Sequence, residues 1–142
     1  MDYFHLTALF PFERAFQTVT RRADVLLRKM FGCGRREMWI LLCITTNGRS
    51  QRDVGAYLGL HPNVVVKLLD GMEEEGLLQR RRNREDRRSQ SLEATAKGRS
   101  TIEKYMAERV GILRELFAPL TDAQISQWRD LSLLIVKGSE QE

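Results

Sequence analysis

Apolar residues near the start of the chain recur at alternating spacings of three and four, which is the period of an α-helix with one buried face. The stripe consists of Phe12, Phe16, Val19, Ala23, Leu26 and Met30. It predicts a helix over Phe12–Met30, with Pro11 in the first helical turn and a Gly-Cys-Gly sequence after its end. Two large aromatic residues at one end of the stripe favour burial against something larger than one small domain supplies.

Three helices without long connections are predicted next. The segment Arg35–Thr46 is apolar on most sides and is therefore expected to be central. Ser50 and Asp53 have the spacing of a capping box, in which each side chain accepts from the other's backbone N–H, so a short helix begins there. After a glycine turn, a helix over 62–75 begins with a proline and is closed by Gly76. Its buried side is expected to contain Val65, Leu68, Leu69 and Met72.

A β-hairpin and two further helices complete the pattern. One strand begins at Leu77, the turn lies near Asn83, and the second strand is Ser89–Glu93. A long helix over Thr95–Phe117 follows, and a second capping box at Thr121 opens the last helix. The apolar stripe of the long helix, expected to be buried, is Ile102, Met106, Val110, Leu113 and Phe117. The predicted fold class is therefore mainly α with a small β-hairpin.

The hairpin holds all the excess positive charge of the chain. The formal net charge is +4, and the segment Gln79–Arg88 contains six arginines against Glu85 and Asp86. Basic and acidic residues balance in the rest of the sequence. A charge run can be an ordinary solvated loop, but arginines without a lysine favour phosphate and base edges, since guanidinium groups donate in a planar fork.

Two short helices separated by a three-residue turn and followed by a basic hairpin form the outline of a winged helix-turn-helix. Some helix-turn-helix proteins never bind DNA, and one open alternative is a winged-helix module that binds another protein. The arginine-rich hairpin favours binding to double-stranded DNA, because neutralised phosphates supply most of the affinity of such complexes.

The stretch from Leu58 to Leu78 resembles the recognition helix and following strand of the MarR (multiple antibiotic resistance regulator) family. The resemblance continues into the wing, where Asp86-Arg87-Arg88 is similar to the family's tip pattern, and into Thr95-Ala-Lys-Gly98, which is similar to the opening of the family's dimer helix. It implies an N-terminal dimerisation helix (1–34), a winged helix-turn-helix domain (35–94, recognition helix 62–75, wing 79–92) and C-terminal dimerisation helices (95–142).

The resemblance and the helical period together select residues for DNA contact. If the apolar side of the 62–75 helix faces the core, the outer side carries Asn63, which can pair with adenine, and His61 and Lys67, which can reach guanine or phosphate. Val64 and Val66 either contact thymine methyl groups or pack within the domain. The resemblance places Arg87 or Arg88 in the minor groove, with Asp86 holding an arginine. Strand alternation lets at most two of the residues 80–82 meet phosphate. The full set expected to contact DNA is His61, Asn63, Val64, Lys67, Arg84, Asp86, Arg87 and Arg88.

The apolar stripes of the terminal helices have two explanations. The stripes can pack within one subunit, or they can be buried between two copies of the chain. The large aromatic residues of the terminal helices lie outside the central winged domain, which favours a homodimer. The two-fold symmetry of a homodimer then matches a pseudo-palindromic operator. The residues expected at the dimer interface are Phe12, Phe16, Val19, Leu113, Phe117 and Trp128.

Other classes of function find little support in the sequence. Two cysteines, Cys33 and Cys43, are too few for a disulfide framework, and no cysteine and histidine have the spacing of metal ligands. No apolar run approaches the roughly 20 residues of a membrane helix, and the start lacks a basic leader, so we expect a cytoplasmic protein. No arrangement typical of an enzyme is present, and no cofactor is expected.

Two possible signals remain open. Arg35 and Arg36 lie beside Cys33 and could lower the pKa of its thiol, as an oxidant sensor would need, although a packing role is favoured. The resemblance also implies release from DNA by a small aromatic ligand. Met38, Trp39 and Tyr57 could line a crevice for it, but the explanation of each as an ordinary core residue is favoured.

Overall fold

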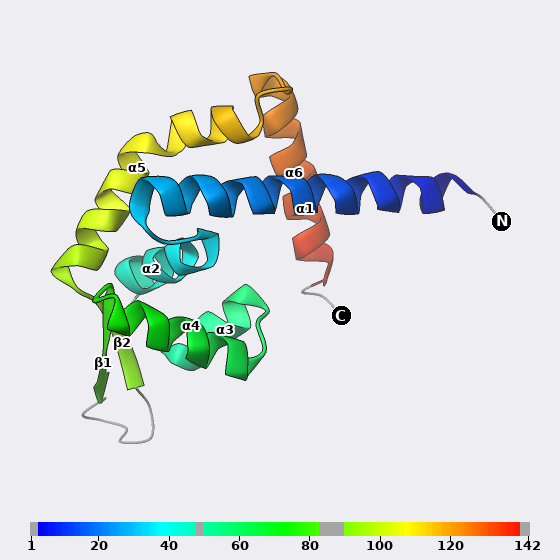
Figure 1. Ribbon diagram of the computed structural model, residues 1–142. Coiled ribbons are helices and arrows are strands. Elements are labelled where there is room, and N and C mark those ends of the chain that lie inside the picture. The colour runs from blue at the N-terminus through cyan, green and yellow to red at the C-terminus, as the bar shows by residue number, and fades with distance from the viewer. Residues whose placement is uncertain (1–2, 48–49, 83–89, 140–142) are drawn as a thin grey trace. The chain divides into compact units, whose positions relative to one another are not determined.

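The computed structural model of the protein describes residues 3–47, 50–82 and 90–139 (Figure 1). The chain divides into two compact units, one up to Arg109 and one from Val110 onward. The predicted boundaries at residues 34 and 94 both fall inside the first unit. The elements in chain order are α1 (Tyr3–Phe31), α2 (Arg35–Asn47), α3 (Gln51–Leu58), α4 (Pro62–Glu74), β1 (Leu78–Arg82), β2 (Gln90–Ala94), α5 (Ala96–Leu116) and α6 (Asp122–Ser139).

This order confirms the predicted fold class, a mainly helical chain with one small antiparallel hairpin. In the first unit α1 lies on one side, α2 lies in the middle, and α3, α4 and the hairpin lie on the other side (Figure 1). Among the described helices, none is both long and apolar enough to cross a membrane.

Helix α1 differs from the prediction at its N-terminus. It begins at Tyr3 and contains Pro11 in its interior, whereas the sequence predicted a start at Phe12 with Pro11 in the first turn. A proline inside a helix removes one backbone hydrogen bond, which makes it a typical sign of a helix start. Here the residues before the proline include no glycine, and the helix continues on both sides of it.

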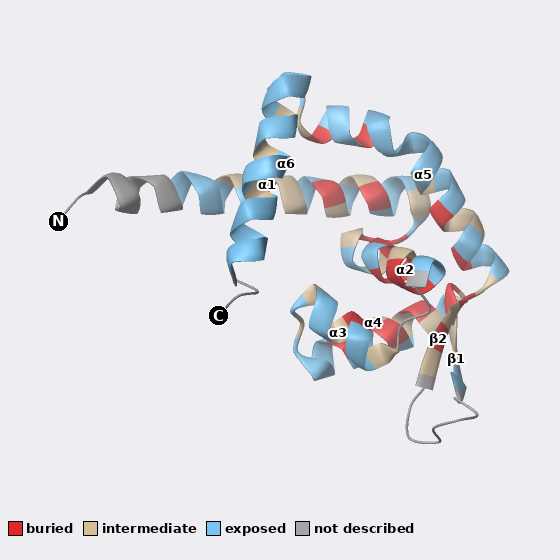
Figure 2. Ribbon diagram, turned by 180° about the vertical axis from the view of Figure 1, so that it is seen from behind, coloured by how far each residue is buried: buried red, intermediate tan, exposed pale blue. Residues whose placement is uncertain are grey.

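The core of the first unit is built around α2, as predicted. Ile40 and Leu41 are completely buried, and they share one core cluster with residues of α3, α4 and both strands. Figure 2 marks the buried positions of the ribbon in red. Fully burying one such aliphatic side chain stabilises a fold by about 1.5–3 kcal/mol. The surrounding core residues are Val54, Val65, Leu69, Met72, Leu77, Leu78, Leu92 and Ala94. The expected inner side of α4 is thus confirmed for three residues, while Leu68 packs against the core only partly buried.

The turn between α3 and α4 follows the sequence signals. Ser50 and Asp53 form the predicted capping box at the start of α3. Gly59 adopts φ 59°, a left-handed conformation in which glycine carries no steric penalty. Gly55 brings the two helices close, since a Cβ at this position would lie 3.2 Å from Cγ2 of Val65.

Helix α4 ends in a Schellman motif that directs the chain into β1. The backbone N–H of Leu77 donates to the carbonyl of Met72, and that of Gly76 donates to the carbonyl of Glu73. Gly76 has φ 69°, as expected of the glycine predicted to close this helix. The hairpin pairs Leu78 with Ala94, and the predicted return strand is shifted by one residue, to Gln90–Ala94. The predicted turn at residue 83 lies outside the described residues.

Polar contacts join α1 to α2. Asp24 of α1 accepts from the backbone N–H of Arg35 at 2.9 Å, which satisfies a free N–H at the start of α2. Arg28 and Glu37 form an ion pair at 2.9 Å beside it. Gly34 lies between these groups, where a Cβ would come within 2.8 Å of the Asp24 carboxylate. The glycine after Cys33 therefore allows the close approach of the two helices.

The second unit contains the end of α5 and all of α6. Thr121 and Gln124 form the predicted capping box at the start of α6. Phe117 and Trp128 pack edge to face with ring centroids 6.0 Å apart.

The apolar stripe predicted to be buried on α5 is only partly so. Ile102 is buried and Phe117 is half-buried, but Met106, Val110 and Leu113 are exposed, and Ile112 and Leu116 are buried instead. The helical period of the apolar residues is correct, but a period cannot show whether the apolar side of a helix packs against the same chain or against another molecule.

Candidate nucleic-acid interface

The exposed side of the first turns of α4 carries the four residues expected there. His61, Asn63, Val64 and Lys67 are all exposed, while Val65 points into the core. His61 is also the N-cap of the helix, since its Nδ1 accepts from the backbone N–H of Asn63 at 3.3 Å. A neutral imidazole that accepts through Nδ1 carries its proton on Nε2. The sequence did not predict this capping role, which leaves Nε2–H to donate to a phosphate or a guanine acceptor.

The two outer valines of α4 are half-exposed and lie on different flanks of the helix. Val64 and Val66 each expose 37% of their surface, whereas Val65 between them exposes 2%. Side chains two positions apart on an α-helix point in directions that differ by about 200° around the helix axis. One flat surface therefore cannot contact both valines equally. Asn63 and Lys67 lie between them on the outer side. No ion pair involves Lys67 among the residues that the structure describes.

Arg80 of β1 is bound to the C-terminal half of α4. Its guanidinium lies 2.6 Å from Oδ1 of Asp70 and 2.5 Å from Oε2 of Glu73. The backbone N–H of Arg80 also donates to the carboxylate of Glu73 at 3.0 Å. This hydrogen bond is the main reason that the pKa of Glu73 lies below its ordinary value, with the guanidinium adding to it.

Arg80 is therefore bound within the protein by Asp70 and Glu73, a role that the sequence did not predict. Asp70 and Glu73 are three residues apart on α4 and so share a side of the helix, and the chain returns past that side into β1. This spacing was the signal that could have identified an intramolecular partner for Arg80.

The next arginine, Arg81, lies on the opposite face of the hairpin and remains largely exposed. Its Nε pairs across the strands with Glu93 at 2.8 Å, and Gln79 also donates to Glu93. The side chain of the following Arg82 lies outside the described residues. The predicted wing residues Arg84, Asp86, Arg87 and Arg88 lie outside the described residues.

The base of the hairpin is fixed by the Thr95-Ala-Lys-Gly98 sequence. Thr95 caps α5 by accepting from the N–H of Gly98 at 3.1 Å, and its hydroxyl donates to the carbonyl of Gly76 at 2.6 Å. Lys97 donates to the carbonyl of Glu75 at 2.6 Å. A Cβ on Gly98 would overlap the carbonyl oxygen of Leu77. The sequence thus joins the end of α4, the base of the hairpin and the start of α5.

The residues expected at a dimer interface differ in exposure. Phe12 and Phe16 of α1 and Leu113 of α5 are exposed, and Val19 is half-buried. Phe117 and Trp128 are half-buried against each other in the second unit.

Cys33 is a core residue, which confirms the favoured packing role. It is 1% exposed, and burial raises the pKa of its thiol to about 11, with Glu37 and Glu75 adding to the increase. The prediction that Arg35 and Arg36 could lower this pKa is wrong, because the positive charges that do lower it, Arg28 and Lys97, are outweighed by burial. Met38 is also buried in the core, but Trp39 and Tyr57 are exposed rather than core residues. Gly71 of α4 has no neighbour that requires a glycine, and nothing in the structure explains it.

Comparisons with known proteins agree with this geometry. A model of the MarR family matches residues 31–89. The uncharacterized HTH-type transcriptional regulator YwoH of Bacillus subtilis is 24% identical over 123 residues, which cover 86% of this chain and 88% of that protein.

Solved structures of the same family match almost the whole chain. A MarR-family transcriptional regulator from Rhodococcus is 26% identical with a TM-score of 0.80, covering 95% of this chain and 96% of the other. AbsC, a MarR-family regulator from Streptomyces coelicolor, is 17% identical with a TM-score of 0.80, covering 96% and 95%. A mutant MarR from E. coli, crystallised with operator DNA, is 18% identical with a TM-score of 0.76, covering 90% and 95%.

Proposed function

We propose that the chain, whose residues 31–89 match a model of the MarR family, is a winged helix-turn-helix transcriptional regulator of that family, a homodimer that represses transcription by binding a pseudo-palindromic DNA operator. The start of α4 would enter the major groove through Asn63, Val64 and Lys67, with His61 at its edge. The wing would contact the minor groove and flanking phosphates through Arg84, Arg87 and Arg88, with Asp86 holding an arginine.

One observation carries this proposal, namely the way that charge is distributed along α4. The acidic residues Asp70 and Glu73 in its C-terminal half are paired with Arg80, while the first turns expose an amide, an imidazole and an ammonium group. The exposed surface at the start of α4 therefore carries little negative charge that would repel the phosphate groups of DNA. In Figure 1 the described strands of the hairpin and α4 lie on the same side of the first unit, with the hairpin beside the C-terminal end of the helix.

The salt dependence of DNA binding tests the proposal. Fluorescence anisotropy with a labelled duplex from the DNA preceding the gene should show binding that weakens by about 10³-fold between 50 and 200 mM salt, if about six phosphates are neutralised. Arg88→Ala should weaken binding by about 1–3 kcal/mol while helicity is unchanged. A salt slope near zero would contradict DNA binding and favour the alternative of a module that binds protein.

Exposed apolar side chains support the homodimer. Phe12 and Phe16 lie on one side of α1, and Met106, Val110 and Leu113 are exposed along α5. Exposed apolar rows of this kind are typical of surfaces that another molecule covers. Sedimentation velocity should show a dimer, and Phe16→Glu should give a monomer. Val25→Glu is a matched control, because Val25 is exposed on the opposite side of α1.

Of the two signals considered for release from DNA, a small aromatic ligand agrees better with the chain than an oxidant does. The buried thiol of Cys33, with its raised pKa, is a poor nucleophile at neutral pH. Trp39 and Tyr57 are exposed and offer aromatic surface to a ligand, whereas Met38 is part of the core.

A further inference from the structure

Helix α1 carries exposed cations on the side that faces away from the core. Ala23 and Leu27 are buried on the inner side of the helix. At about 100° per residue, Arg14, Arg21 and Val25 point within about 20° of the direction opposite to Ala23. All three are exposed, and Val25 is the one apolar residue among them.

Two further exposed cations extend this positive surface along the helix. Arg22 and Lys29 are seven residues apart and therefore lie on the same flank of the outer side. We name the four residues Arg14, Arg21, Arg22 and Lys29 the α1 cationic row. From Arg14 to Lys29 the row rises about 22 Å along the helix axis, at about 1.5 Å per residue.

The carboxylates between α1 and α2 are bound to groups outside the row. Asp24 accepts from the backbone N–H of Arg35 at 2.9 Å, and its carboxylate also lies near the guanidinium of the same arginine. Glu37 pairs with Arg28 at 2.9 Å. These two acids therefore balance cations that are not members of the row.

The remaining acid of the described part of α1, Glu13, does not neutralise the row either. It is turned by about 100° from Arg14 around the helix axis and accepts from Gln17 at 3.4 Å. Among the residues that the structure describes, no ion pair involves Arg14, Arg21 or Lys29. Most of the charge of the row is thus available to a second molecule.

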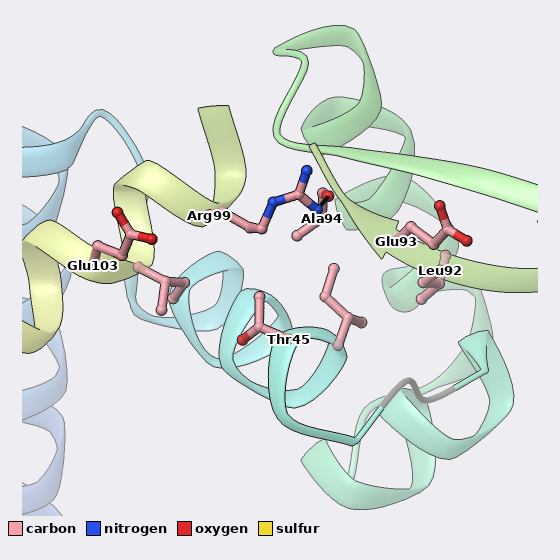
Figure 3. A pocket seen from close by; sticks show the side chains of 8 residues that line it. Thr45, Leu92, Glu93, Ala94, Arg99 and Glu103 are labelled. Carbon is pink, nitrogen blue, oxygen red and sulfur yellow. Dashed lines mark hydrogen bonds between the residues drawn. The ribbon is translucent and has the colours of Figure 1, made fainter. Parts of the chain in front are cut away.

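Other cations of the first unit are held by the chain itself. Arg80 binds Asp70 and Glu73. Nη1 of Arg99 donates to the carbonyl of Ala94 at 2.6 Å, and Figure 3 shows this side chain directed toward the end of β2. The α1 cationic row differs from these arginines because its side chains extend from the outer side of the unit into solvent.

We propose that the α1 cationic row binds the phosphate backbone of a second DNA duplex while the start of α4 binds the first. In the first unit α1 lies on the side opposite to α3, α4 and the hairpin, so a straight duplex bound by α4 does not reach the row (Figure 1). A duplex carries one charge per about 1.7 Å of its axis, so a row of about 22 Å meets several phosphates. Phe12 and Phe16 lie on the inner side of α1, so the row also stays open in the proposed homodimer.

The composition of the row favours duplex DNA over other anionic partners. A protein partner would need an apolar anchor at the centre of its interface, and Val25 alone is a small one. The row contains no aromatic side chain on which unpaired bases could stack. Three arginines and a lysine along one straight helix match a linear polyanion, and contacts to phosphate alone carry no base specificity.

A bead assay with two duplexes tests the bridging. Beads carry the operator duplex with protein below saturation, and a fluorescent duplex of unrelated sequence is added at 50 mM salt. The wild-type protein should retain the fluorescent duplex, and Arg14→Gln/Arg21→Gln should retain at least about tenfold less. Lys104→Gln/Arg114→Gln, which removes the same charge from exposed positions of α5, is the matched control and should retain it normally.

Two further readouts separate loss of phosphate contacts from damage to the fold. The slope of log affinity for the unrelated duplex against log salt should be less steep by about 1.8 in Arg14→Gln/Arg21→Gln, at about 0.9 per lost contact. Operator affinity and helicity should be unchanged. Arg14→Lys/Arg21→Lys should restore retention, because the charges are kept.

Simultaneous binding of two duplexes rests on the proposed function, whereas binding to the row alone does not. Amide NMR shifts on titration with the unrelated duplex should therefore include Arg14 and Arg21 even if no operator is found. Equal retention by the two glutamine variants, shifts that leave α1 unaffected, or tighter binding of polyglutamate than of the duplex would each overturn the proposal. The last result would assign the row to an acidic protein instead.

Discussion

Nη2 of Arg80 lies 2.6 Å from Oδ1 of Asp70, so the first strand of the wing is bound to the helix proposed to enter the major groove. The arginine side chain is only 17% exposed, and Glu73 binds its second nitrogen. The angle between the hairpin and α4 is therefore set within the protein before any DNA is bound.

Loss of Arg80 should destabilise the fold more than loss of its neighbour. We expect Arg80→Gln to lower the free energy of unfolding by about 1–3 kcal/mol, because two adjacent carboxylates lose their shared cation. Arg81→Gln is the control, since an exposed pair such as Arg81 with Glu93 contributes about 0–1 kcal/mol. Urea unfolding followed by circular dichroism measures both. Equal losses of stability would show that the ion pairs of Arg80 with Asp70 and Glu73 have no special role.

The same cluster predicts a loss of stability in acid. The N–H of Arg80 holds the pKa of Glu73 below its ordinary value, so the folded state favours the carboxylate. Its contribution is fully present above the unfolded-state pKa of about 4.3 and is lost as the pH falls through the lower folded-state pKa. Glu73→Gln should therefore destabilise the protein at pH 7 and have a smaller effect at pH 3. A difference that is independent of pH would contradict this assignment.

Two glycines of the first unit should respond oppositely to replacement by alanine. Gly98→Ala places a methyl group against the backbone carbonyl of Leu77, which cannot move aside as a side chain would, so we expect a loss of about 1–3 kcal/mol or more. Gly71→Ala meets no atom within 4 Å and should stabilise α4 by about 0.5–1 kcal/mol. Thermal unfolding of the two variants compares them directly, and the same sign for both would refute the explanation.

Cys33 should resist thiol reagents in the folded protein. With a pKa of about 11 and almost no exposure, it holds little thiolate at pH 8. Iodoacetamide labelling followed by mass spectrometry should modify it only after urea is added. Rapid labelling without urea would show that the α1–α2 turn opens, and would restore an oxidant as a signal.

Val64 provides a test of base recognition in DNA that does not depend on charge. Footprinting first locates the operator. If Val64 contacts a thymine methyl group there, replacing that thymidine by deoxyuridine should weaken DNA binding by roughly 0.8 kcal/mol, the contribution of one buried methylene. The effect should disappear in Val64→Ala. Val66→Ala, on the other flank of α4, is the comparison that shows which valine faces the bases.

Local sequence signals, such as capping boxes and helix-ending glycines, were sufficient to predict most of the fold. Ser50 with Asp53, Gly76, and Thr121 with Gln124 each act within three or four residues, so their roles can be read from spacing alone. Pro11 is the exception, because an ordinary helix-start signal lies inside a long helix whose other residues favour it.

The candidate site was less predictable because its key contacts join distant parts of the chain. Arg80 was counted with the arginines of the wing, and only the fold shows that Asp70 and Glu73 reach it. His61 was expected to contact DNA, and its additional role as a cap depends on the rotamer of one side chain. Periodicity likewise placed an apolar stripe on α5 but could not say that Met106 and Val110 would remain exposed.

The close approach of Gly98 to Leu77 has a mechanical consequence. Side chains in an interface can adjust by changing rotamer. The backbone of Gly98 at the start of α5 packs directly against the backbone carbonyl of Leu77, so this contact cannot adjust in that way. A tilt of the first turns of α5 must therefore rotate the hairpin and the end of α4 by the same angle. If the protein binds an operator as proposed, any adjustment of the hairpin to the spacing of that operator then requires bending elsewhere, farther along α5 or in the turn that precedes α2.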